Sequence, residues 1–201
     1  YPFTPGFEAS GTVIEVGISV DAFAVGDDVV AMMGEELGGQ ATILSCPQAQ
    51  VFSKPESMSF EEACSLPVVA ITMVNAFEKA QLKAGERILI QTAAGGTGLI
   101  AVQLAQFAGA EIYATAGSQD KLDYLKSLGV EHVINYREQD FEQEILRLTN
   151  GRKVDVVINT LGDDALQKGL NCLSSGGRYI EIAMTAIKSA RNIDLSILAN
   201  N

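Results

Sequence analysis

From Glu86 onward the sequence alternates short apolar runs of β-forming residues with longer amphipathic segments, and this alternation limits the possible folds most strongly. The runs predicted as strands are 87–91, 111–116, 132–135, 154–159 and 178–182. The segments predicted as helices are 98–108, 119–128, 141–149 and 164–173. Strands that alternate with helices at this spacing form parallel sheets through right-handed crossovers. The pattern therefore predicts an α/β fold, a Rossmann-type parallel sheet with helices on both faces.

A glycine-rich segment follows the first predicted strand. Gly96, Gly98 and Ala101 fit the spacing G-x-G-x-x-G/A, which lets the backbone approach a pyrophosphate at the N-terminus of a helix. Because the motif lies between a strand and a helix, it favours dinucleotide binding over a merely tight turn. The loop residues expected to contact the cofactor are Ala94, Gly95, Gly96, Thr97 and Gly98.

The end of the second strand indicates which dinucleotide is bound. NAD-binding sites usually place a carboxylate there, whereas this strand ends in Thr-Ala-Gly-Ser at 115–118 and only Asp120 lies nearby. NADPH is therefore favoured. The residues predicted to surround its 2′-phosphate are Gly117, Ser118, Lys121, Tyr136 and Arg137. The alternative is that Lys121 and Arg137 are solvated surface charges.

The N-terminal part has a different character. Residues 11–45 carry short alternating runs such as 12–16, separated by turn-forming residues, and predict small antiparallel strands. Ser59 and Glu62 have the spacing of a capping box, so a short helix should begin there. A longer helix is expected at about 67–81.

Composition disfavours several classes of partner. The formal net charge of −11, from 14 basic and 25 acidic residues, argues against a nucleic-acid partner. Apolar stretches such as 66–74 are shorter than the roughly 20 residues of a membrane span. Three scattered cysteines suit a reducing compartment, so we expect a cytoplasmic protein without a membrane segment. His132 is the only histidine, which excludes a Cys/His zinc cluster within this chain, and no metal site is expected.

Several separate motifs occur in the order found in the medium-chain dehydrogenase/reductase superfamily, and the chain resembles this superfamily over nearly its whole length. The resemblance is strongest to enoyl reductase domains of modular polyketide synthases, followed by zinc-independent quinone oxidoreductases. The motifs that carry the resemblance are 5–11 (PGFEASG), 25–27 (VGD), 66–69 (LPVV), 93–98 (AAGGTG) and 176–181 (GGRYIE).

The resemblance implies two domains, with residues 1–58 as part of a GroES-like substrate domain and 59–201 as a Rossmann-type NADPH-binding domain truncated at its C-terminal end. The chain begins at Tyr1 without a methionine, so we expect a segment of a longer polypeptide. Zinc-dependent relatives carry a histidine ligand where this sequence has Phe7, which cannot bind a metal.

The resemblance also implies a reaction, the NADPH-dependent reduction of an enoyl thioester during polyketide biosynthesis. Thr72, Asn159 and Leu161 would lie near the nicotinamide, although Thr72 also suits a helical threonine that bonds back to a carbonyl. Lys121 and Asp140 match residues proposed as proton donors or organisers in polyketide enoyl reductases. Quinone reductases instead make Lys121 and Tyr136 ligands of the 2′-phosphate, and Asp140 is also a good helix N-cap.

The implied partner is an acyl carrier protein that presents the substrate on a phosphopantetheine arm, in the same polypeptide or assembly. The alternatives are a free-standing NADPH:quinone oxidoreductase or alkenal reductase, and a structural protein that merely keeps the nucleotide site. An unusual outcome of hydride transfer, such as ring closure to a cyclopropane, is also compatible with the sequence.

Overall fold

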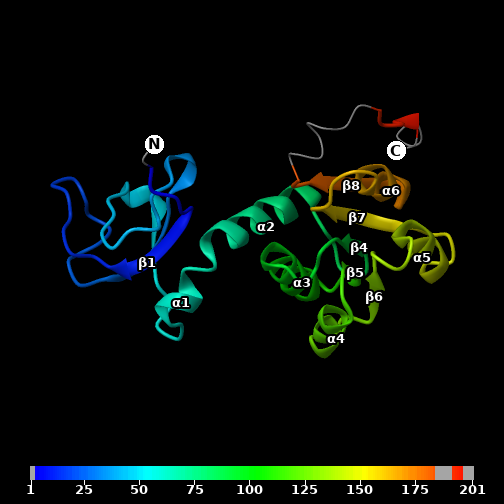
Figure 1. Ribbon diagram of the computed structural model, residues 1–201, viewed down its shortest axis with the longest axis horizontal. Coiled ribbons are helices and arrows are strands. Elements are labelled where there is room, and N and C mark those ends of the chain that lie inside the picture. Colours follow the sequence, from blue (N-terminus) through cyan, green and yellow to red (C-terminus); the bar gives the residue numbers. More distant parts are fainter. Residues whose placement is uncertain (1–2, 184–191, 197–201) are drawn as a thin grey trace. The chain divides into compact units, whose positions relative to one another are not determined.

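The chain forms two compact units, Tyr1–Thr72 and Met73–Asn201. The computed structural model describes residues 3–183 and 192–196 (Figure 1). Within these residues, none of the helices combines the length and the apolar character that crossing a membrane requires.

The first unit contains a three-stranded antiparallel sheet in the order β1-β2-β3. Its strands are β1 (Glu8–Thr12), β2 (Asp28–Met32) and β3 (Val51–Ser53), and the connections carry the 3-10 helices η1 (Gly34–Glu36) and η2 (Gln48–Gln50). The predicted antiparallel strands are confirmed, but β1 ends at Thr12 rather than extending to residue 16. Just beyond β1, the Val13 N–H donates to the Asp27 carbonyl and the Val13 carbonyl accepts from the Gly26 N–H, both at 2.9 Å.

Two helices follow this sheet, α1 (Phe60–Ala63) and α2 (Pro67–Ala80). The predicted capping box is present: the Ser59 hydroxyl accepts from the Glu62 N–H, and the Glu62 carboxylate accepts from the Ser59 N–H. At the start of α2 the Glu8 carboxylate accepts from the Val68 N–H at 2.8 Å. A carboxylate at this position satisfies a backbone donor that the helix itself leaves unpaired and interacts favourably with the helix dipole.

The second unit is the predicted parallel sheet with helices on both faces, and its strand order is β6-β5-β4-β7-β8. The strands are β4 (Arg87–Ile90), β5 (Glu111–Ala116), β6 (His132–Asn135), β7 (Val154–Asn159) and β8 (Leu173–Glu181). The helices between them are α3 (Gly96–Ala108), α4 (Gln119–Ser127), α5 (Phe141–Leu148) and α6 (Ala165–Asn171) (Figure 1).

β8 begins five residues before the predicted start at Arg178. Val154 pairs with Leu173 and Val156 with Arg178, so the register shifts where residues 174–177 are accommodated. Two serines and two glycines occupy this stretch, and their weak β propensity explains why the sequence did not predict a strand there.

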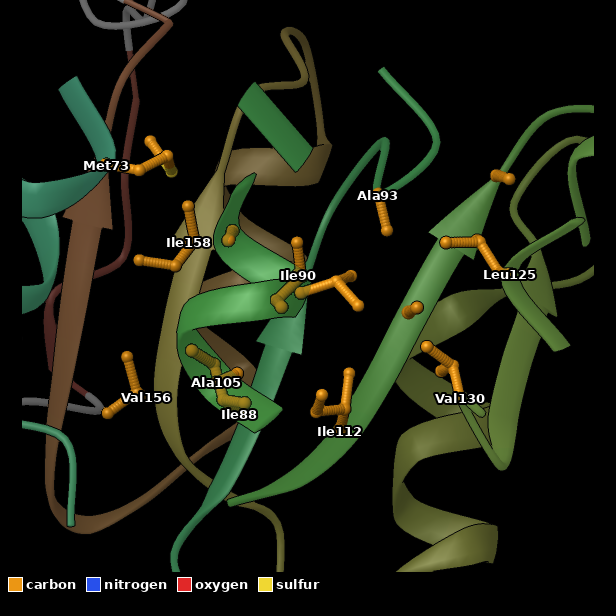
Figure 2. Close-up of a cluster of buried hydrophobic side chains, with 14 of the residues drawn as sticks. Met73, Ile88, Ile90, Ala93, Ala105, Ile112, Leu125, Val130, Val156 and Ile158 are labelled. Atoms are coloured by element: carbon orange, nitrogen blue, oxygen red, sulfur yellow. The ribbon is translucent and has the colours of Figure 1, made fainter. Parts of the chain in front are cut away.

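Apolar side chains cover both faces of the sheet, as period-two alternation requires. One face packs against the C-terminal half of α2 together with α3 and α4 (Figure 2), and the other packs against α5 and α6. Among the residues in the first of these cores are Met73, Ile88, Ile90, Ala105, Leu125, Val156 and Ile158.

All five strands run in one direction, so their carboxyl ends lie along a single edge. β4 is flanked there by β5 and β7, which is the point where the strand order reverses. Open α/β sheets bind ligands outside the carboxyl ends of the strands at such a switch point.

Candidate functional site

The glycine-rich loop leaves β4 at this switch point and leads directly into α3. Gly95 is the N-cap of α3 in an extended conformation, and no side chain caps the helix. The first N–H groups of α3 are therefore not used by a capping side chain from the described part of the chain. Uncapped N–H groups at a helix N-terminus form a binding site for a phosphate group.

Gly98 brings α3 close to the loop that precedes it. A β-carbon at position 98 would lie 2.5 Å from the Thr92 carbonyl oxygen and 2.6 Å from the Ala93 carbonyl carbon. Both neighbours are backbone atoms that cannot rotate away. Only glycine therefore allows this close approach of helix and loop.

Three threonines hold the start of the loop. Thr92 adopts a left-handed conformation with φ of 48°, which is uncommon for a β-branched residue. Its N–H donates to the Thr115 hydroxyl at 3.2 Å, and its hydroxyl is hydrogen-bonded to that of Thr160. Thr160 also donates to the Gln91 carbonyl at 3.2 Å. The loop is thus tied to the ends of β5 and β7. No local sequence pattern predicted this network, whose partners lie up to 69 residues apart.

The end of β5 collects the residues predicted to surround a 2′-phosphate. A β-carbon at Gly117 would lie 2.9 Å from both the Tyr136 hydroxyl and the Arg137 Nε, so these two side chains lie over the backbone at 117. Ser118 is the N-cap of α4, and its hydroxyl makes no capping bond. Lys121 lies in the first turn of α4, exposed and without an ion-pair partner among the described residues. No carboxylate occupies positions 115–118.

At the end of β7 the predicted residues Asn159 and Leu161 are bonded to each other. The buried Asn159 amide donates to the Leu161 carbonyl at 2.8 Å and accepts from the Leu161 N–H at 3.2 Å. It also donates to the Glu181 carboxylate at 2.7 Å, a partner on the neighbouring strand β8. Glu181 belongs to the 176–181 motif, but sequence reasoning gave it no role.

Asp140 occupies the N-cap of α5, where its carboxylate accepts from the N–H groups of Glu142 and Gln143. It also forms an ion pair with Lys168 of α6 at 3.1 Å. Partial burial opposes the charged form, but the hydrogen bonds from Lys168 and from the two N–H groups outweigh it and keep the pKa of Asp140 below its usual value. These contacts are those of a helix N-cap.

Thr72 is the last residue of the first unit, and its hydroxyl donates to the Val68 carbonyl one turn earlier at 2.6 Å. This is the back-bonding arrangement expected of a threonine inside a helix. Phe7 is largely exposed. In the described part of the chain, no group of three or more His, Cys, Asp or Glu side chains could hold a metal ion.

The residues at the carboxyl edge fit a nicotinamide dinucleotide. The uncapped N-terminus of α3 suits the pyrophosphate, and the glycine at 98 provides the close packing of loop and helix that this motif needs. At the end of β5, hydroxyl and cationic groups surround the position of the adenosine ribose in this fold.

The sheet and its loop together define a dinucleotide-binding protein of the Rossmann class. The family model described as zinc-binding dehydrogenase matches residues 96–200, and the one described as alcohol dehydrogenase GroES-like domain matches residues 1–56. The chain therefore belongs to the zinc-binding dehydrogenase family, within the medium-chain dehydrogenase/reductase superfamily. It is similar to polyketide synthases and to a solved enoyl reductase.

Three relatives illustrate this membership. A highly reducing polyketide synthase, apmlA of Arthrinium phaeospermum, is 42% identical over 187 residues, which cover 90% of this chain and 8% of that protein. The crystal structure of the CurK enoyl reductase is 39% identical with a TM-score of 0.86, over 98% of this chain and 58% of that one. An Escherichia coli quinone oxidoreductase complexed with NADPH is 31% identical with a TM-score of 0.79, over 92% of this chain and 60% of that one.

The chain thus spans about a tenth or less of the curated synthases it matches. It spans about three fifths of the solved enoyl reductases and quinone oxidoreductases. Members of the superfamily use a nicotinamide dinucleotide, and the quinone oxidoreductase binds it as NADPH.

Proposed function

We propose that this chain is the cofactor-binding part of an NADPH-dependent enoyl-thioester reductase in polyketide biosynthesis. The observation that carries the proposal is the phosphate loop at the switch point, in a chain that resembles polyketide enoyl reductases over nearly its whole length. When bound, the cofactor supplies a hydride to the β-carbon of an α,β-unsaturated acyl group.

In this proposal the chain's own residues bind the cofactor and orient its nicotinamide. Residues 94–98 receive the pyrophosphate on backbone N–H groups. The turn Asn159–Leu161 lines the nicotinamide. Two catalytic candidates remain, Lys121 and Asp140. We assign Lys121 to binding of the 2′-phosphate. We assign Asp140 to the N-cap of α5, because its carboxylate accepts two capping hydrogen bonds and forms an ion pair with Lys168. A proton-handling role for either residue is an outcome of the tests given in the Discussion.

NADPH is proposed in preference to NADH for an electrostatic reason. The end of β5 lacks the carboxylate that would accept from a ribose 2′-OH and repel a 2′-phosphate. The residues proposed to bind this phosphate are Gly117, Ser118, Lys121, Tyr136 and Arg137. An arginine and a lysine can each donate charge-assisted hydrogen bonds to a phosphate.

We also propose a partner and a domain division. The substrate would arrive on the phosphopantetheine arm of an acyl carrier protein. Because this chain carries a net charge of −11, attachment within one assembly would have to bring an acidic carrier to it. The division would place a GroES-like region at 1–58 and the nucleotide-binding domain at 59–201. Cys46, Cys64 and Cys172 are all unpaired, which supports a reducing, cytoplasmic compartment.

A second function is a free-standing quinone or alkenal reductase. The similarity to the Escherichia coli quinone oxidoreductase favours it, because that enzyme has the same fold and was solved in complex with NADPH. Such an enzyme needs no pantetheine arm.

The direct test is isotope transfer in the full-length protein. NADPH deuterated at the transferring position of the nicotinamide is supplied together with a carrier-bound 2-enoyl chain, and the acyl product is analysed by mass spectrometry. The proposal predicts a saturated chain with deuterium at the β-carbon and a solvent proton at the α-carbon. An unchanged enoyl chain, or a saturated chain without the label, would contradict it. The control is the same mixture without protein.

A further inference from the structure

Glu181, the last residue of β8, connects two segments of backbone at the carboxyl edge of the sheet. One carboxylate oxygen accepts from the Asn159 amide at 2.7 Å, and the other accepts from the Ala183 N–H at 2.8 Å. Asn159 and Glu181 are also paired in the sheet, and the Asn159 carbonyl accepts from the Ile182 N–H at 3.0 Å. The carboxylate therefore fixes the end of β8 and the Asn159 side chain at the end of β7.

The contacts of Asn159 fix the orientation of its amide. The Nδ2 group has two protons, one given to the Leu161 carbonyl and one to Glu181. A rotated amide would place its carbonyl oxygen against the Glu181 carboxylate and its NH₂ group against the Leu161 N–H. Because both donors are used within the protein, the Asn159 side chain has no N–H left to donate to a ligand, and its contacts hold the turn that follows it.

The same contacts extend to the phosphate loop. Thr160 lies between the two residues that are bonded to each other, Asn159 and Leu161, so the position of its hydroxyl depends on them. The Thr160 hydroxyl donates to the Gln91 carbonyl and is hydrogen-bonded to the Thr92 hydroxyl. Hydrogen bonds thus connect the end of β8 to the end of β7 and then to the start of the loop after β4.

We propose that Glu181 is a positioning residue: its carboxylate holds the turn after β7 against the phosphate loop and so sets the nicotinamide side of the cofactor site. This inference rests on the proposed function, because it assumes that the nicotinamide of NADPH lies beside that turn. Glu181 itself need not touch the cofactor.

The test compares two ligands in Glu181→Gln. Glutamine keeps the shape of the side chain but has one acceptor oxygen in place of two, so either Asn159 or Ala183 loses its partner. NADPH covers the whole cofactor site, whereas 2′,5′-ADP covers only the adenosine half. In the full-length protein the Kd of NADPH should rise about tenfold, as the loss of one charge-assisted hydrogen bond predicts, and that of 2′,5′-ADP should stay unchanged.

Glu86→Gln is the matched control. The Glu86 carboxylate accepts from two Arg178 nitrogens at 3.0 and 2.6 Å, just before β4 at the opposite edge of the sheet. Loss of the Glu86 carboxylate should lower the melting temperature without changing the ratio of the Kd of NADPH to the Kd of 2′,5′-ADP. Glu181→Asp provides a second variant, which retains both acceptors and the charge on a shorter side chain, and it should also weaken NADPH selectively.

Each outcome bears on the proposal. An unchanged NADPH Kd in both Glu181 variants, or an equal loss of NADPH and 2′,5′-ADP, would overturn the positioning role while leaving the proposed function intact. A wild-type protein that binds neither ligand would instead refute the proposed function, and the inference would fall with it.

Discussion

We propose that side chains at the end of β5 decide whether the second unit binds NADPH or NADH. Tyr136 and Arg137 lie over Gly117, and the exposed ammonium group of Lys121 follows in the first turn of α4. A 2′-phosphate at this position would accept charge-assisted hydrogen bonds from the arginine and the lysine, whereas an uncharged 2′-OH would form weaker hydrogen bonds with them. The proposed preference for NADPH therefore depends on a few single residues and can be tested one residue at a time.

Replacing Lys121 by Ala should raise the Kd of NADPH about tenfold and leave that of NADH nearly unchanged, because only NADPH carries the phosphate that the lysine contacts. Titration of the full-length protein with each nucleotide measures both values. Lys126→Ala is the matched control, since Lys126 lies in the last turn of the same helix and is also exposed. Equal weakening of both nucleotides, or tighter binding of NADH by the wild type, would contradict this assignment.

Asp140 allows its two roles to be separated by paired variants. Asp140→Ala should cost about 1 kcal/mol of stability through loss of the N-cap and leave turnover largely intact, whereas Asp140→Asn should restore most of that stability because asparagine also caps helices. Thermal unfolding and steady-state turnover measure the two effects. If both variants lose turnover while thermal stability and NADPH affinity remain normal, Asp140 takes part in the chemistry.

The pH dependence of stability gives an independent check on Asp140. Its pKa is lowered in the folded state, so the unfolded state takes up the proton more readily as pH falls. The stabilisation by its carboxylate is therefore fully present above the unfolded pKa of about 3.9 and is lost as pH falls through the lower folded pKa. The difference in stability between wild type and Asp140→Asn should shrink over this acidic range. A stability difference between wild type and Asp140→Asn that does not change with pH would show that the charge of the Asp140 carboxylate does not contribute to stability.

At the scale of elements, local patterning predicted most of the second unit. The four helices between its strands begin and end within two residues of their expected positions, because amphipathic periodicity and caps are local signals. The early start of β8 was missed, since Ser174–Gly177 has no β-type pattern and lies where the pairing with β7 shifts register. The Thr92–Thr160 and Asn159–Glu181 bonds were missed for the same reason. They join residues 68 and 22 positions apart, and no local pattern marks such pairs.

The join between the phosphate loop and α3 depends on Gly98. Gly98→Ala should destabilise the second unit by roughly 2 to 3 kcal/mol, because the added methyl group overlaps backbone atoms that cannot move aside, and it should abolish NADPH binding. Gly162→Ala is the control, since a β-carbon there meets nothing within 4 Å. Thermal unfolding and NADPH titration measure both effects. A Gly98→Ala protein with wild-type stability and affinity would show that the loop tolerates a side chain.

At the scale of the whole molecule, the family's zinc chemistry is the first property to test. The family model is described as zinc-binding, but this chain has Phe7 at the position where the resemblance noted above implies a histidine zinc ligand. We therefore predict that activity of the full-length protein survives exhaustive chelation. Elemental analysis of the purified, active protein checks this directly, and stoichiometric zinc in the active protein would refute it.

We propose that this chain belongs to a reductase of enoyl thioesters rather than of quinones. The measurement that tests it most directly compares kcat/KM of the full-length protein for a carrier-linked 2-enoyl thioester with kcat/KM for a simple quinone, both with NADPH. This ratio reports how differently the enzyme stabilises the two transition states. We predict a marked preference for the thioester, whose carbonyl accepts the negative charge that hydride addition creates. A marked preference for the quinone would contradict this assignment and support the free-standing quinone reductase.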